Sequence, residues 1–181
     1  MSMPTTPAAM GTMHNSSHVV DVRIDDDPWH DPQLDAEAVI RAAVRATLAV
    51  CGTDAVSTGV SVLLTSDAEM AQLNARWRGR DGPTNVLSFP AAAPGQPGHG
   101  DGCLGDIALG FGILAREAAE NGTPLVDHVS HMTVHGVLHL LGYDHGTEAE
   151  AGRMERRETA VLRDLLIEDP YSGTETRCNA M

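Results

Sequence analysis

Hydrophobic and polar positions alternate in some stretches of the chain and follow a helical period in others. Alternation or short apolar runs rich in β-branched residues predict strands over residues 19–24, 59–64, 86–89 and 104–111. Helical periods with capping residues predict helices over residues 35–50, 67–77, 113–120 and 148–167, and one more that Pro124 opens and Gly142 ends. Strands separated by helices indicate an α/β (α+β) fold, a single domain with a small mixed β-sheet and helices packed on it.

The connecting and terminal segments lack such a pattern. The acidic, proline-containing residues 25–32 and the Gly/Pro-rich residues 90–102 are predicted to be loops, and the second is expected to be mobile. Residues 1–17, rich in Met, Thr, Pro and Ser, are interpreted as a disordered extension, and residues 172–181 as a frayed tail. The folded domain is therefore expected to span residues 18–171.

Three histidines lie in the stretch HGVLHLLGYDH over residues 135–145. His135 and His139 are four residues apart, so a helix places both imidazoles on one face. Gly142 can take the left-handed conformation that ends a helix, which lets the chain turn back and bring His145 to the same point. Three imidazoles leave one coordination position open for water, as in a hydrolytic zinc site. We therefore predict a metal site with Zn²⁺ as the expected ion, although nickel, copper and iron also bind imidazole.

The same spacing nearly matches the signature of the metzincin proteases, H-E-x-x-H-x-x-G-x-x-H, in which the glutamate is the general base. Gly136 occupies the position of that glutamate, so the ligands are present but the proton acceptor for peptide hydrolysis is absent. A larger side chain at Gly136 is expected to clash with neighbouring backbone. The pattern therefore favours a metal-dependent hydrolase that is not a protease.

The composition restricts the class of protein further. With 181 residues, 42% of them hydrophobic, and a net charge of -13, the chain suits one soluble globular domain. All twelve basic residues are arginine, and the negative charge disfavours broad nucleic-acid binding, so any RNA site must be local and no DNA partner is expected. Cys51, Cys103 and Cys178 are odd in number and widely spaced, which argues against a disulfide framework. Without a membrane-spanning run or a signal-peptide pattern, a cytoplasmic protein is expected.

Two blocks of the sequence resemble the YbeY family of bacterial endoribonucleases. Residues 135–145 fit the family motif H-G-x-L-H-L-x-G-Y-D-H without a gap, and LNARWRGRDGPTNVLSFP over residues 73–90 resembles its second hallmark. With LGDIALG and EDPY, the similarity covers roughly residues 19–171. It implies a metal-dependent, single-strand-specific endoribonuclease for ribosomal RNA processing, at the 3′ end of 16S rRNA, and for ribosome quality control. The partners it implies are single-stranded RNA, ribosomal RNA and the small ribosomal subunit.

Arg78 stands where the second block of the family has its arginine, and the resemblance places that arginine in the active-site cleft. A guanidinium can form a fork to two phosphate oxygens, so Arg78 is the predicted catalytic residue that binds the scissile phosphate. The alternative is a solvated arginine at a helix end. For Arg76 and Arg80 we favour this alternative.

His131 lies one helical turn before His135, but His131 and His139 are separated by about 12 Å along a helix axis, too far to share one ion. His131 and His128 are therefore interpreted as cleft-lining, supporting or packing residues. Asp144 is expected either to orient a ligand histidine or to serve the turn. The histidines in predicted loops are expected to be solvated: His14, His18, His30 and His99.

Two alternatives to a zinc-dependent endoribonuclease stay open. A metal-dependent hydrolase of another substrate, including a peptide, is disfavoured by Gly136. A non-catalytic ribosome-assembly factor with a structural metal is disfavoured because a structural zinc usually has a fourth protein ligand.

Overall fold

The computed structural model describes residues 19–53, 59–91 and 102–172. The extension predicted over residues 1–17 lies outside these ranges, as do most of the predicted 90–102 loop and nearly all of the predicted tail. The domain boundaries at these segments therefore stay a prediction.

Four strands form one mixed sheet in the order β1-β2-β4-β3. Their bounds are β1 (Val19–Ile24), β2 (Gly59–Thr65), β3 (Val86–Pro90) and β4 (Cys103–Gly110). β1, β2 and β4 are parallel, and β3 pairs antiparallel with β4 at the edge of the sheet. The predicted small mixed sheet is thus confirmed, and β3 is an edge strand beside the site described below.

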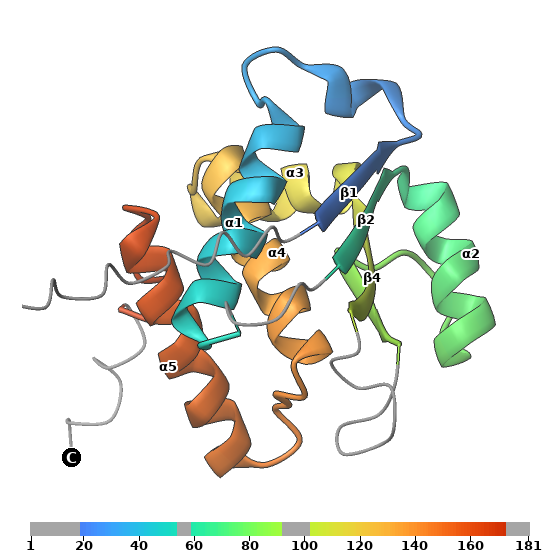
Figure 1. The fold of residues 1–181 in the computed structure, drawn as a ribbon. Helices are drawn as coiled ribbons and strands as arrows, with labels where there is room; N and C mark the ends of the chain where they lie inside the picture. Colours follow the sequence, from blue (N-terminus) through green and yellow to red (C-terminus); the bar gives the residue numbers. More distant parts are fainter. Residues whose placement is uncertain (1–18, 54–58, 92–101, 173–181) are drawn as a thin grey trace, which may run out of the picture.

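Helices cover both faces of this sheet. They are α1 (Ala36–Val50), α2 (Asp67–Arg78), α3 (Phe111–Asn121), α4 (Leu125–Leu140) and α5 (Glu148–Asp164). Figure 1 shows α1, α4 and α5 on one side of the strands and α2 alone on the other. The predicted α/β class is confirmed. α5 ends earlier than the predicted residue 167, because Leu166 has a positive φ of 62° that a helix does not accept.

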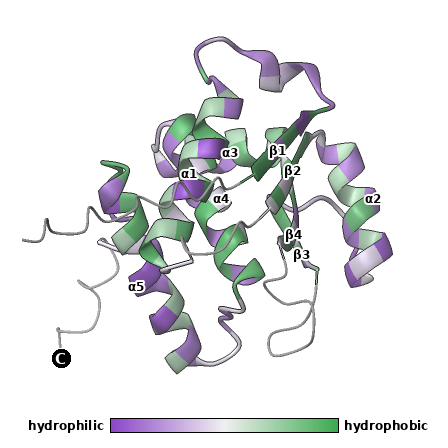
Figure 2. Cartoon of the chain, viewed as in Figure 1, coloured by the Kyte–Doolittle hydropathy of each residue, from purple (hydrophilic) through white to green (hydrophobic). Residues whose placement is uncertain are grey.

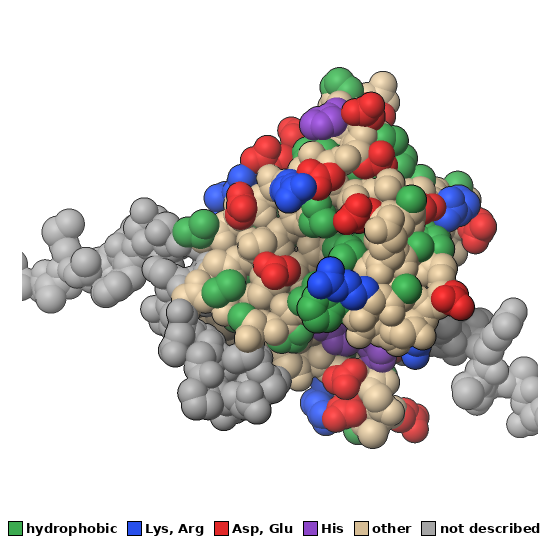
Figure 3. Space-filling model, turned by 90° about the vertical axis from the view of Figure 1, so that its right-hand side faces the viewer, with side chains coloured by type: hydrophobic (Ala, Val, Ile, Leu, Met, Phe, Trp, Pro, Cys, Tyr) green, Lys and Arg blue, Asp and Glu red, His purple; other side chains and the backbone are tan. Residues whose placement is uncertain are grey.

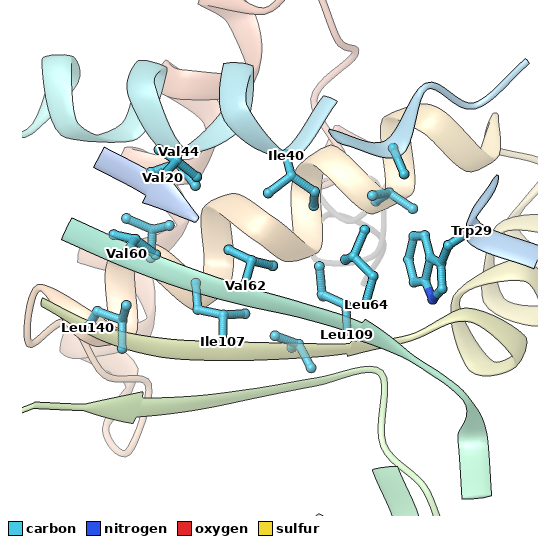
Figure 4. Packing of buried hydrophobic residues seen from close by; sticks show 14 of the residues in the cluster. Val20, Trp29, Ile40, Val44, Val60, Val62, Leu64, Ile107, Leu109 and Leu140 are labelled. Atoms are coloured by element: carbon cyan, nitrogen blue, oxygen red, sulfur yellow. The ribbon is translucent and has the colours of Figure 1, made fainter. Parts of the chain in front are cut away.

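The main core lies between the sheet and the α1/α4 layer, where side chains of β2 and β4 meet α1 (Figure 4). A second cluster joins Val134 and Leu138 of α4 to Ala43 of α1 and to Met154 and Leu162 of α5. α4 is therefore packed between the sheet and α5 and is hydrophobic over much of its length (Figure 2). A functional group on α4 consequently stands on a rigid element.

The predicted loop over residues 25–32 contains structure that the sequence did not indicate. A short 3-10 helix, η1 (Asp27–His30), carries Trp29, whose side chain is 1% exposed. The indole Nε1 of Trp29 donates a hydrogen bond of 3.1 Å to the carbonyl of Thr65, and its ring meets Phe111 edge to face. This single aromatic anchor fixes an otherwise acidic segment to the end of β2.

The helices of the described segments include none that is both long and apolar enough to cross a lipid bilayer. Cys51 and Cys103 are free thiols, and Cys178 lies outside the described residues.

Candidate metal centre and its cavity

The three predicted ligand histidines meet at the C-terminal end of α4. The helix ends at Leu140, and Gly142 has a φ of 86°, the left-handed break that the sequence predicted. One ring nitrogen each of His135, His139 and His145 lies within 4.8 Å of the other two. The structure therefore brings together all three residues in an arrangement that can hold one metal ion.

Hydrogen bonds to the far side of two rings determine which nitrogen faces the centre. His139 Nδ1 lies 3.0 Å from the carbonyl oxygen of Tyr143, and His135 Nδ1 lies 2.7 Å from Glu158 Oε1. A carbonyl can only accept a hydrogen bond, and so can an ionised carboxylate, so each Nδ1 carries the proton and each Nε2 presents a lone pair. These two Nε2 atoms are only 3.0 Å apart. Two unprotonated nitrogens at this distance repel each other unless a cation lies between them, so the donor set fits a metal.

Burial of His139 favours the neutral form of its ring. The pKa of His139 is lowered to about 4, first because burial disfavours the imidazolium, then because His135 and His145 would add like charges. At neutral pH the ring is therefore unprotonated, as metal binding requires. His145 is exposed, and its ring centroid lies 5.6 Å from that of His135 and 5.0 Å from that of His139.

A buried carboxylate behind the histidines was missed by the sequence analysis. Glu158 is 1% exposed and accepts hydrogen bonds from His135, from His131 at 3.4 Å and from the hydroxyl of Tyr171. Burial alone would raise the pKa of Glu158, but these donors together outweigh burial and lower it to about 2. The pKa of Tyr171 is raised, first by burial and then by Glu158.

A signal for Glu158 was present in the sequence. On α5 it shares a face with Met154, Val161 and Leu162, all of them buried. A charged residue on the apolar face of an amphipathic helix needs a partner inside the protein, because an unpaired buried charge is costly. The histidines of α4 are that partner.

Among the described residues, His128 and His131 lie outside the three-histidine group. His131 contacts Glu158, and His128 Nε2 lies 2.8 Å from Glu117 Oε2, which also accepts from the amide of Asn85. Of the two roles open for Asp144, the structure shows the turn: its Oδ1 accepts from the backbone N–H of His145 at 2.8 Å. The histidines predicted to lie in loops divide between exposed His30 and three outside the described residues, His14, His18 and His99.

The three histidines lie at one side of a cavity of about 550 Å³. Polar groups of Thr84, Asn85 and Ser88 line it, and so does Arg78 from the C-terminal end of α2. Within the described ranges no carboxylate forms an ion pair with Arg78, although Asp144 lines the same cavity. The geometry thus places a basic group and a metal-binding group around one hollow.

Gly136 lies on the face of α4 that packs against the sheet. A Cβ there would lie 3.2 Å from Ile107 side-chain atoms and 3.2 Å from Ser88 Oγ, which also donates to the carbonyl of Gly136 at 3.1 Å. The expected clash with backbone is therefore corrected, because the obstacles are side chains of β3 and β4. A glutamate at this position would press into the core and could not replace the missing protease base without displacing them.

Comparisons with known proteins show the family of the chain. Residues 24–166 match the family model of Endoribonuclease YbeY. The Endoribonuclease YbeY of Rhodopseudomonas palustris is 44% identical over 90% of this chain and 85% of its own length, and that of Nitrobacter hamburgensis is 48% identical over 77% and 75%. The solution structure of TM1509 from Thermotoga maritima shares the fold, with a TM-score of 0.51, 22% identity, and coverage of 84% of this chain and 98% of that one. The chain belongs to the Endoribonuclease YbeY family.

Proposed function

We propose that the chain is a zinc-dependent endoribonuclease that cleaves single-stranded RNA. The observation that carries the proposal is that Arg78 and the three-histidine group face the same cavity in a member of this family. Following the family resemblance, we place its action in the cytoplasm, on ribosomal RNA in the small ribosomal subunit, at the 3′ end of 16S rRNA and in ribosome quality control.

Arg78 binds the scissile phosphate in this proposal. Its guanidinium offers two parallel N–H groups to two phosphate oxygens, which fixes the phosphate and stabilises negative charge that develops on it. The net charge of -13 repels RNA elsewhere, so a local cation on the cavity wall is the feature that admits a phosphate.

Zinc is the ion that three imidazoles and an open coordination position favour. A metal held there supplies Lewis-acid chemistry to a phosphodiester group. The protein contributes the position of the ligands: Glu158 and the Tyr143 carbonyl hold the Nδ1 protons of His135 and His139, so both Nε2 atoms point to one place before any ion binds.

The concave position of the histidines supports a preference for single strands. The group lies within a cavity between α4, β3 and the end of α2, so the RNA backbone has to bend into it. A single strand can bend and turn its bases away, whereas an A-form duplex holds its phosphates on a regular helical surface. Paired RNA therefore reaches the ligands poorly.

The proposal is tested with an RNA that carries the unpaired 3′ extension of a small-subunit rRNA precursor, compared with the same RNA annealed to a complementary strand. We expect cleavage of the single strand, loss of cleavage with a chelator, recovery with zinc and little cleavage of the duplex. His139→Ala should be inactive, and His30→Ala, which changes an exposed histidine remote from the cavity lining, should be fully active. Equal cleavage of both RNAs, or an active His139→Ala protein, would contradict the proposal.

A further inference from the structure

A second hollow, of about 770 Å³, lies on the α2 face of the sheet. Ser88 and Pro90 of β3 line both this hollow and the metal cavity, so the two meet at the edge strand. Along β3, Ser88 faces α4 through its bond to Gly136, while Phe89 faces α2. An RNA strand that occupies the metal cavity can therefore continue around β3 into the second hollow.

An aromatic pair forms part of the wall of this second hollow. Trp77 is 60% exposed although its helical stripe also carries the buried Met70, and it meets Phe89 edge to face with ring centroids 5.8 Å apart. The guanidinium of Arg76 lies 5.3 Å from the Trp77 ring centroid. Figure 3 shows hydrophobic and basic side chains meeting beside histidines on this face of the molecule. Unpaired nucleobases stack on exposed aromatic rings, and arginine near such a ring adds a favourable cation–π contribution.

The charged residues around the two hollows favour a nucleotide whose phosphate lies in the metal cavity and whose base lies in the second hollow. Asp21 and Asp106 line the second hollow and repel phosphate, and Arg23, which also lines it, is paired with Asp25. Arg78, the residue after Trp77, lines the metal cavity instead. One nucleotide can bind in both hollows at once, with its phosphate at Arg78 and its base against Trp77. A base paired in a duplex is already stacked between its neighbours and has no free face to offer.

We propose that Trp77, supported by Phe89, is a stacking site for one unpaired nucleobase next to the scissile phosphate. This inference rests on the proposed ribonuclease function and gives its single-strand preference a physical cause. Trp77 is a binding residue in this scheme, because it touches the base and not the reacting atoms.

The test measures cleavage of single-stranded RNA by Trp77→Ala and Trp77→Phe proteins, with metal content and circular dichroism as checks on fold. We expect Trp77→Ala to raise KM about tenfold with little change in kcat, and Trp77→Phe to retain most of the binding, because a phenyl ring still stacks. Leu166→Ala is the matched control, since Leu166 is 93% exposed and lines neither hollow, and it should match the wild type. An unchanged KM in a folded Trp77→Ala protein would overturn the stacking site.

RNAs that lack a single base can identify which nucleotide stacks on Trp77. An abasic residue at one position beside the cleavage site should weaken binding to the wild type and have no further effect on Trp77→Ala, as two changes to one contact are not additive. Full additivity at every position would refute the contact.

Tryptophan fluorescence tests the stacking site independently of the proposed ribonuclease function. RNA added to metal-free protein should quench tryptophan emission in the wild type and not in Trp77→Phe, in which buried Trp29 is the remaining tryptophan. Quenching without cleavage by the metal-loaded protein would support the stacking site while the ribonuclease proposal failed. Cleavage without quenching would support the ribonuclease proposal and contradict the stacking site.

Discussion

Glu158 Oε1 lies 2.7 Å from Nδ1 of His135, and this contact ties α5 to the end of α4 that carries two of the candidate metal ligands. The same carboxylate also accepts from His131 and Tyr171, so one buried residue fixes the ring that carries the first ligand nitrogen. A carboxylate behind a ligand histidine sets its tautomer and raises its basicity.

Glu158 should therefore be required for tight metal binding. Glu158→Gln keeps the shape of the side chain but loses its charge, and we expect metal affinity to fall about tenfold. Glu158→Ala leaves the His135 ring without its partner, and we expect metal affinity to fall by up to about 100-fold. Competition with a chromophoric chelator measures both. Glu155→Gln, an exposed change on the same helix, is the control. Wild-type affinity in Glu158→Ala would show that the contact does not support the metal site.

Arg78 is expected to matter for RNA and not for the metal. Arg78→Ala should retain fold and metal content but lose much of the cleavage, and Arg78→Lys should recover only part, because lysine cannot form the two-pronged contact. Arg153→Ala, an exposed arginine that does not line the metal cavity, serves as the control. Wild-type turnover by Arg78→Ala would remove Arg78 from the site.

Salt dependence gives a second measure of Arg78. If the arginines near the end of α2 (Arg76, Arg78 and Arg80) contact phosphates, the slope of log K against log salt for single-stranded RNA should be no steeper than about -2, since each contact contributes about 0.7. Arg78→Ala should make the slope shallower by about 0.7. An unchanged slope would mean that Arg78 makes no phosphate contact.

The chemistry should not extend to peptides. The protein is expected to leave casein intact, and Gly136→Glu should not create a protease, because the new side chain meets Ile107 and Ser88 instead of the metal. Overpacking and a buried charge should lower the free energy of unfolding by about 1 to 3 kcal/mol or more, measured by thermal or denaturant unfolding. A stable Gly136→Glu protein with chelator-sensitive casein cleavage would contradict this reading of Gly136.

Local patterns were enough to predict the strands, the helices and the three-histidine group. The spacing of His135 and His139 and the glycine at residue 142 are properties of one helix and its end, so the sequence contains them directly. Residues joined only by tertiary packing were less accessible. Trp29 stands alone in an acidic stretch, and its burial against Thr65 and Phe111 follows from the packing of distant elements.

Helical periodicity also fails to predict burial where the apolar stripe of a helix extends past the elements that pack against it. Trp77 continues the stripe of Met70, yet Met70 is buried and Trp77 is largely exposed, because the described elements cover only the first part of α2. Glu158 is the opposite case, a charged residue that an apolar stripe carries into the core. Both departures from the pattern lie beside the metal cavity, where function can outweigh packing.

Titration of zinc into metal-free protein, with the initial rate of single-stranded RNA cleavage as the readout, tests whether the three histidines hold a catalytic metal. We predict that the rate starts near zero, rises linearly and reaches a plateau at about one ion per chain, since His135, His139 and His145 form one site with one open position. His139→Ala should stay near zero at the same zinc concentrations. Full cleavage by the metal-free protein, or an equal rise in His139→Ala, would contradict the assignment of a catalytic metal to these histidines.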